Sequence, residues 1–580
     1  MSADKETPAS THNTEFIDDR LSSSRADAHM KMLLEGMRSN PFVPPVDGCP
    51  INTLPNELLS YIFTLGAQLD YADDKDEEDI DDDDSDDDDE PTPEFQVLAS
   101  HVCKRWRDVA IQTPSLWTRL DFTEGPPFDK SRTYIERSAG CPLVIDIDCT
   151  VPDDDSDEEE EEDEVEEVEE FDETEEVVQS DADAPDDEPK SSAATKRKSR
   201  SFGPADLDAI RALILPHVNR WRIFELMTED YAIMHHTLNA LATAPAAEQL
   251  KMLHLYHYDD TDDIEHFEPA ELRAPVVPFA GQAPQLVNVA LWGVHVDWPR
   301  CDFFQGLEEL ELAYHAQDVR PEWDDFTRML TRSPNLVTLT LCMSGPAGAP
   351  ADWPKDTIEL PSVRNLVLAF QPQAYASALL ERLVFPNAAS LALDLEEEDY
   401  STFVAQLAAP LPGKTKSLLN GLQELRISGL PCNDAAIDTL YASLPNVVDL
   451  HLNRYHLEEP FFTRLFPQAP GAASSSAAAG DAHVPLPSLQ NLSSSGVDGE
   501  QMHQLAEARI AAGRPLKKVF MEIDDVVEPD DEKWLREHLE RFEFFEGSDD
   551  EDELEIDGIE IMSDDGLEAM SGDEDDASQD

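Results

Sequence analysis

Few residues in this sequence have the types and spacing that catalysis or metal binding requires. The densest constellation is HLYHYDDTDD, over His254–Asp263, where imidazole and carboxylate groups crowd together as metal ligands do. His254, however, stands between Leu253 and Leu255, and this alternation places it on the outward side of a β-strand. The spacing therefore favours an ordinary strand residue over a metal ligand.

Other signatures of chemistry are absent from the sequence. It contains no H-E-x-x-H, G-x-x-x-x-G-K-[ST], G-x-S-x-G or G-x-G-x-x-G motif, and its seven cysteines never stand as C-x-x-C. We therefore expect a protein that is not an enzyme and that needs no metal or cofactor.

The cysteines and the hydropathy pattern also bear on location. An odd number of scattered cysteines is typical of reduced thiols inside a cell. The N-terminus lacks an apolar segment of the secretory type, and no apolar run approaches membrane-spanning length. We expect a cytoplasmic protein, a nuclear one or both, with no membrane partner and no direct contact with nucleic acid.

The net charge of −83 is concentrated in three tracts. Residues 70–94, 153–189 and 546–580 together hold 58 of the 125 acidic residues. Such runs repel themselves and offer little apolar surface to bury, so we expect disorder in all three. Polyacidic tracts also attract basic proteins, which gives the chain a possible class of partner.

A Leu-x-x-Leu-x-Leu pattern recurs ten times, with starts separated by 21 to 42 residues. In seven copies a proline stands two residues before the first position. Clear copies are LKMLHL (250–255), LEELEL (307–312), PNLVTLTL (334–341), PSVRNLVL (361–368) and PNVVDLHL (445–452). Each copy predicts a short strand with its leucines in the core. Segments 231–244, 323–333 and 434–444 have helical apolar spacing and would cover the other side.

This pattern predicts an α/β fold in which one strand and one helix form each repeat of a stack. The residues between the leucines would face outward and could bind a protein partner. They are Met252, His254, Tyr256, Asn288, Trp292, Glu309, Glu311, Thr338, Thr340, Asn365, Asp449 and Asn453. Residues 514–524 suggest a last strand, followed by a capping helix over DDEKWLREHLERFEFF (530–545). An unrelated α/β fold with several leucine-rich strands is the alternative.

A second pattern precedes the repeats. In LPNELLSYIFTL (54–65) the apolar residues recur at helical spacing, and residues 98–110 carry another apolar stripe. The order INTLPNELLSYIF, then VCKRWRDVAIQTPSLWTRLD, resembles the F-box, in the divergent form common in fungal proteins. The features that match are Leu54-Pro55, Glu57, Leu58-Leu59, Ile62-Phe63, Val102 to Trp106, and Pro114-x-Leu116-Trp117.

The resemblance implies a partner as well as a fold. F-box helices dock against the Skp-type adaptor of a cullin–RING ubiquitin ligase of the SCF type. Carried over by motif, the adaptor-binding residues would be Leu54, Pro55, Leu58, Leu59, Ile62, Phe63, Val102, Cys103 and Trp106. The alternative for each of these side chains is that it merely closes a local core.

The expected domain organisation follows from both patterns. It comprises an N-terminal segment (1–50), an F-box-like domain (51–122) interrupted by an acidic loop (70–94), a solenoid of degenerate leucine-rich repeats (123–545) with an acidic insertion (151–203), and an acidic tail (546–580). The function expected of an F-box joined to such repeats is substrate recognition for the ligase, with an unidentified target protein. The alternatives are a chaperone that binds histones or other basic proteins, and a ligase-independent scaffold.

Overall fold

The computed structural model describes residues 50–77, 93–150, 202–258, 265–467 and 484–545. Within these ranges, residues 50–70 and 93–113 form one compact unit, and residues from 114 onward form another. The expected boundary at residue 122 differs from this division. Residues Pro114–Trp117 form a 3₁₀ turn (η2) that leads directly into β1 (Arg119–Leu120), the first strand of the second unit.

The first unit is helical. It contains η1 (Pro50–Thr53), α3 (Asn56–Glu77) as far as Asp70, α4 (Phe95–Val102) and α5 (Lys104–Ile111). Pro55 directly precedes α3, where its missing N–H costs no helical hydrogen bond. The buried ring of Phe63 contacts Phe95 and Trp106, with centroid distances of 6.5 and 5.0 Å. This aromatic contact joins all three α-helices of the unit.

Gly66 and Asp70 fix the contact between α3 and α4. A Cβ atom on Gly66 would lie 2.3 Å from the ring of Phe95, so any larger residue here would force this ring to move. The carboxylate of Asp70 accepts a hydrogen bond of 2.7 Å from the backbone N–H of Phe95, at the start of α4. Such a bond satisfies one of the N–H groups that a helix leaves unpaired at its first turn.

The expected acidic loop therefore begins later than residue 70. Asp70 is a helical residue with a structural partner, and α3 continues to Glu77, because extending a helix that already exists costs far less than starting one. Of the acidic residues expected in this loop after Glu77, Glu94 is described and directly precedes α4. The others lie outside the described residues, as do residues 151–201 of the acidic insertion, the tail and the expectations of disorder there.

The second unit is built on a parallel sheet of 14 strands, each paired with the next along the chain except for the small strands β8 and β10. After β1 come β2 (Leu143–Asp148), β3 (Trp221–Thr228), β4 (Met252–His257), β5 (Asn288–Trp292), β6 (Glu309–Ala313), β7 (Thr338–Cys342), β9 (Asn365–Ala369), β11 (Ser390–Asp394), β12 (Glu424–Gly429), β13 (Asp449–Asn453), β14 (Asn491–Ser495), β15 (Lys518–Glu522) and β16 (Arg541–Phe545). Strands β8 (Ile358–Glu359) and β10 (Leu383–Val384) pair only with each other.

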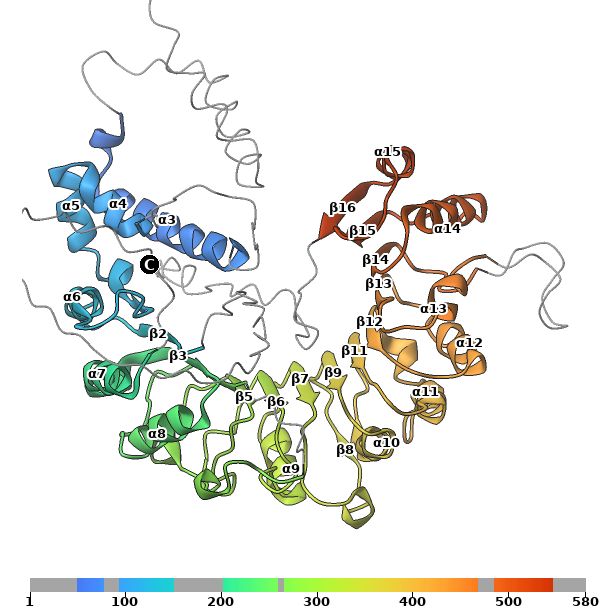
Figure 1. Ribbon diagram of the computed structural model, residues 1–580, viewed down its shortest axis with the longest axis horizontal. Helices are drawn as coiled ribbons and strands as arrows, with labels where there is room; N and C mark the ends of the chain where they lie inside the picture. Colours follow the sequence, from blue (N-terminus) through green and yellow to red (C-terminus); the bar gives the residue numbers. More distant parts are fainter. Residues whose placement is uncertain (1–49, 78–92, 151–201, 259–264, 468–483, 546–580) are drawn as a thin grey trace, which may run out of the picture. The chain divides into compact units, whose positions relative to one another are not determined.

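Helices connect successive strands and lie along one side of the strand array (Figure 1). They are α6 (Asp129–Arg137), α7 (Pro204–Ile214), α8 (Tyr231–Ala242), α9 (Trp323–Thr331), α10 (Gln373–Arg382), α11 (Ser401–Ala408), α12 (Asp434–Ala442), α13 (Pro460–Thr463), α14 (Gly499–Ala511) and α15 (Pro529–His538). Between β4 and β5, the described residues 265–287 contain two 3₁₀ turns and no α-helix: η4 (Ala270–Leu272) and η5 (Pro278–Gly281). The expected helices over 231–244, 323–333 and 434–444 are thus confirmed.

Two rows of apolar side chains run across the strands and form the core. One row contains Leu253, Val289, Leu310, Leu339, Leu366, Leu391, Leu425, Leu450 and Leu492, each opposite the next in the strand register. The other contains Leu255, Leu291, Leu312, Leu341, Leu368, Leu393, Ile427 and Leu452. None of these side chains is more than 2 % exposed. The predicted burial of the repeat leucines is confirmed.

The C-terminal end of the sheet differs from the expectation. The predicted capping helix over residues 530–545 ends early, since α15 stops at His538 and Arg541–Phe545 adds the last strand, β16. Side chains alternate between the two faces of a strand, so Phe542 and Phe544 lie on the same face. They pair with Val519 and Met521 of β15 and extend the two apolar rows.

A short chain of polar side chains joins three consecutive repeats beyond the second apolar row. His315, Ser344 and Gln371 each stand three residues after a leucine of that row, and all are buried. The ring of His315 bonds the carbonyl of Val294 (2.9 Å) and the hydroxyl of Ser344 (2.9 Å), and the Gln371 amide donates to the Ser344 carbonyl (2.8 Å). Burial lowers the pKa of His315 to about 3, so the imidazole is neutral at physiological pH.

Two buried serines allow a test of this hydrogen bonding. Ser494 takes a leucine position in the second row, and its Oγ has no hydrogen-bond partner among the described residues, whereas Ser344 bonds His315. We predict that Ser494→Ala raises the free energy of unfolding by about 1 kcal/mol and that Ser344→Ala lowers it by about as much. Urea denaturation of both variants measures the difference, and a loss of stability in both would contradict it.

Candidate functional site

Helix α3 carries two apolar stripes on different sides. Leu59 and Phe63 point into the helical unit and are fully buried. Leu58, Ile62, Leu65 and Leu69 are spaced by four, three and four residues and are 49, 40, 41 and 65 % exposed. We call these four residues the outer stripe. A helix that packs against a core on one side needs one apolar stripe. The outer stripe is therefore apolar surface that the core of this unit does not require.

Helix α4 also exposes apolar side chains. Leu98 and Val102, one helical turn apart, are 47 and 62 % exposed, and Tyr61 of α3 is 62 % exposed. Exposed apolar residues are ordinary when they stand singly. Here they recur on two helices of one small unit, which is a feature of a binding surface.

The nine residues expected at an adaptor interface divide by exposure. Pro55, Leu58, Ile62, Val102 and Cys103 are exposed, and Leu54 and Trp106 are half-buried. Leu59 and Phe63 lie in the core, where Phe63 holds the aromatic contact between the helices. For these two side chains the alternative of a local core fits the observed burial.

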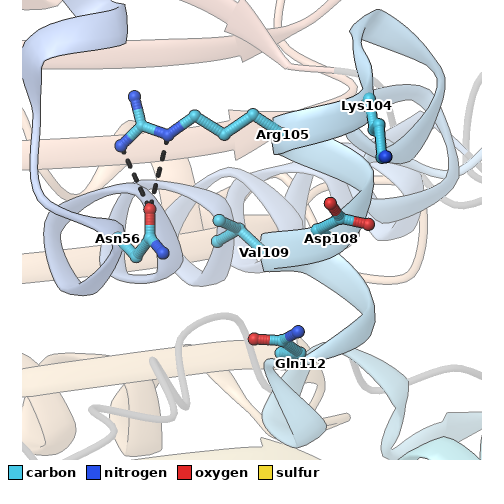
Figure 2. Close-up of a pocket in the computed structure, with 6 residues that line it drawn as sticks. All are labelled: Asn56, Lys104, Arg105, Asp108, Val109 and Gln112. Atoms are coloured by element: carbon cyan, nitrogen blue, oxygen red, sulfur yellow. Dashed lines mark hydrogen bonds between the residues drawn. The ribbon is translucent and has the colours of Figure 1, made fainter.

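Arg105 holds the turn that contains Leu54 and Pro55. Its guanidinium donates to the backbone carbonyl of Leu54 and, at 3.1 Å and 3.4 Å, to the side-chain oxygen of Asn56 (Figure 2). Lys104, Asp108, Val109 and Gln112 line the open depression beside this contact. Arg105 lies within the motif from Val102 to Trp106, but the sequence does not indicate this role, because a contact across 49 residues has no local signal.

The sheet presents a second surface, which we call the open face: the strand side chains that alternate with the two apolar rows. Of the twelve residues expected there, ten are half-buried. Thr338 and Thr340 of β7 are the exceptions, because both are buried, at 8 and 2 % exposure. The hydroxyl of Thr338 accepts a 3.1 Å hydrogen bond from Asn365, and Thr340 lies between Glu311 and Val367 in the register. The expectation that these threonines face solvent is wrong.

Several expected binding residues also hydrogen-bond neighbouring strands. Asn365 bonds Thr338, the carboxylate of Asp449 accepts from Asn491, and Asn453 accepts from the Ser495 hydroxyl at 3.2 Å. These residues therefore stabilise the strand order in addition to any contact with a partner.

Acidic and aromatic side chains gather on the open face over β4 to β6. The Tyr256 and Trp292 rings meet edge to face at 5.0 Å, and Glu309 and Glu311 project from the next strand. Glu309 accepts a hydrogen bond from Asn288. Burial raises the pKa of Glu311 to about 7, against the opposing effect of the Trp292 indole, and burial also raises the pKa of Glu309.

The histidine of the possible metal constellation has other partners. The His254 ring lies 2.9 Å from the side-chain oxygen of Asn288 and 3.1 Å from the Tyr256 hydroxyl. Across the ranges that the structure describes, no group of three or more His, Cys, Asp or Glu side chains is arranged to hold a metal ion. The aspartates of that constellation lie at residues 259–263, outside those ranges.

Comparison with known protein families finds no family model that matches this chain, and comparison with curated proteins finds no match either. Among the helices in the described parts of the chain, none is both long enough and apolar enough to cross a membrane.

The raised pKa of Glu311 predicts a dependence of stability on pH. A carboxyl group whose pKa is higher in the folded state than its usual 4.5 stabilises the fold below pH 4.5, and this contribution is lost as the pH rises through 7. Glutamine cannot ionise, so Glu311→Gln should be more stable than the parent by about 1–3 kcal/mol at pH 8 and equal to it near pH 4.5.

Thermal or urea denaturation across this pH range measures the difference. Glu507→Gln, which changes an exposed glutamate on α14, serves as the control and should show no such trend. A constant difference between Glu311→Gln and the parent at every pH would contradict the prediction.

Proposed function

We propose that the protein is the substrate-recognition subunit of an SCF-type cullin–RING E3 ubiquitin ligase. In this proposal the helical unit acts as an F-box that docks a Skp-type adaptor. The sheet and its helices form a solenoid of degenerate leucine-rich repeats, whose open face binds a target protein. The other subunits carry out ubiquitin transfer, so the chain itself needs no catalytic residue, metal or cofactor.

The outer stripe of α3 is the observation that carries this proposal. Fully burying a large aliphatic side chain is worth about 1.5–3 kcal/mol, and each of the four residues is roughly half exposed. Covering the stripe would therefore contribute several kcal/mol before the costs of association, which suits a stable protein–protein contact. Leu58 and Ile62, two residues expected from the F-box resemblance, are part of this stripe.

The second unit supports the other half of the proposal. In the described parts of the chain, the helices that connect the fourteen parallel strands lie on one side of the sheet, and no described helix covers the opposite face. This supports binding of a partner on that face. Repeats of this kind present an extended binding surface because each strand adds one row of outward side chains.

A chaperone for histones or other basic proteins is the second candidate function. The −83 net charge favours it, because polyacidic chains attract basic partners in a strongly salt-dependent way. This candidate gives no role to the outer stripe, since an acidic tract binds through charge rather than through apolar surface. We therefore place it, and a ligase-independent scaffold, behind the ligase subunit.

The outer stripe provides the first test. Leu58→Ser combined with Ile62→Ser should abolish co-purification of the adaptor and cullin, because two apolar contacts become polar while the inward residues Leu59 and Phe63 stay in place. Affinity purification followed by mass spectrometry measures this. Ile523→Ser with Val526→Ser, at aliphatic positions 54 and 72 % exposed in the second unit, is the matched control.

Recovery of histones rather than adaptor and cullin from the parent chain would favour the chaperone. Undiminished recovery of adaptor and cullin with the double serine variant would remove the outer stripe as the docking surface.

The acidic loop provides a second test. Residues 78–92 contain 11 acidic residues and no basic one. Replacing these acids by the matching amides should leave adaptor binding unchanged, or strengthen it at low salt if the adaptor is acidic, because screening over about 8 Å at physiological ionic strength weakens the repulsion. Binding measured at 50 and 500 mM salt decides this. Loss of binding in the amide variant would mean that the loop belongs to the interface.

A further inference from the structure

The open face over β3 to β6 carries an excess of negative charge. Glu225, Glu309 and Glu311 project from β3 and β6, and His254 of β4 lies 3.9 Å from the Glu225 carboxylate. Asp146 on β2 is already paired, since its carboxylate lies 3.2 Å from the Arg119 guanidinium. Within the described ranges, no lysine or arginine forms an ion pair with Glu309 or Glu311.

Glu309 and Glu311 are partly desolvated without a positive partner. They are neighbours on one face of β6, and the contact of Glu309 is the neutral amide of Asn288. A carboxylate withdrawn from water without a counter-charge is unfavourable, and a cation that approached it would relieve this cost. The register places Ala290, a methyl side chain, between His254 and Glu311, so no bulky residue separates these groups.

Three aromatic side chains lie beside the carboxylates, toward the carboxyl ends of the strands. Trp292 follows two residues after Ala290 on β5, with the Tyr256 ring at 5.0 Å and the Tyr314 ring at 5.6 Å. All three rings are half-buried. Indole is the best partner among aromatic side chains for a cation held over a ring.

We propose that this acidic aromatic surface, formed by Glu225, Glu309, Glu311, Tyr256 and Trp292, binds a lysine or arginine side chain presented by a partner protein. Carboxylates hold the positive head group and the aromatic rings contact its apolar stem. The inference deepens the proposed function and rests on it, because it states the chemistry of the target segment: basic, and neither acidic nor phosphorylated. An acidic segment would meet like charges here and be rejected.

The other half of the open face has a different charge pattern. There Glu424 has a positive partner, since the Arg426 guanidinium lies 3.1 Å from its carboxylate, with the His451 ring at 3.6 Å. Because Glu309 and Glu311 lack such a positive partner among the described residues, we place the partner's basic side chain over β4–β6 rather than over the sheet as a whole.

The test uses a fluorescein-labelled peptide, Gly-Ser-Arg repeated four times, and the same peptide with citrulline at each arginine. Fluorescence anisotropy with the full chain at 150 mM salt measures binding. We expect the arginine peptide to bind at least tenfold more tightly than the citrulline peptide. Equal binding of the two peptides would overturn the proposal.

Three variants separate this surface from the acidic tracts, which also attract a basic peptide. Glu309→Gln with Glu311→Gln should weaken arginine-peptide binding at least tenfold. Glu507→Gln with Glu537→Gln removes the same charge from exposed helical positions and should change it less than twofold. Trp292→Leu keeps the net charge and should weaken binding severalfold. Equal losses in the two glutamine pairs would show that the tracts hold the peptide, and no loss with Trp292→Leu would show that the rings take no part in binding; either result would overturn the proposal.

The experiment also distinguishes this inference from the proposed function. The Leu58→Ser/Ile62→Ser variant should lose the adaptor and retain the peptide, and the Glu309→Gln/Glu311→Gln variant should do the reverse. If the parent chain binds the peptide but recovers no adaptor, only the ligase proposal fails. If it recovers adaptor but binds both peptides alike, only this inference fails.

Discussion

The in-register pairing of the repeat leucines is the constraint on which the second unit depends. Each strand is only five to eight residues long from β2 through β7, and a strand of this length with one helix cannot enclose a core. Stacking the repeats changes this, because each leucine of a row lies against the corresponding leucine of the next strand. A shift of one residue in any strand would turn its leucines onto the open face, so burial and register enforce each other.

This constraint also explains why the chain tolerates long insertions. Residues 151–201 separate β2 from α7, yet β2 and β3 pair as neighbours in the sheet. Closing a longer loop adds only about 0.6 kcal/mol per doubling of its length, whereas the apolar rows gain from every added strand. The contact of α3 with α4 follows the same logic, because Gly66, Asp70 and Phe95 fix the junction on either side of the acidic residues. An acidic insertion can therefore enter either unit without changing the contacts that define it.

The sequence predicts the features that repeat and misses those that depend on a single contact. Leucine spacing predicts most of the strands and their burial, because one physical pattern recurs many times, and helical apolar spacing predicts α8, α9 and α12. It does not predict that FEFF forms a strand, since Phe542 and Phe544 acquire their direction from β15 rather than from the residues beside them. Nor does it predict the buried polar chain of His315, Ser344 and Gln371, because three different residue types occupy equivalent positions. The pairing of Arg105 with Asn56, and the burial of Thr338 and Thr340, likewise arise from residues distant in the sequence.

The outer stripe and the acidic aromatic surface would bind through different interactions, so one chain could hold two partners independently. The outer stripe of α3 is apolar, so a contact there depends mainly on buried apolar area rather than on charge. The acidic aromatic surface combines carboxylates with rings, so a contact there weakens as ionic strength rises. Beside each surface, a residue that supports the fold is adjacent to one available to a partner: Leu59 next to Leu58 on α3, and Leu291 next to Trp292 on β5. Substitutions confined to the outward members can therefore test the two proposed binding activities separately, without unfolding either unit.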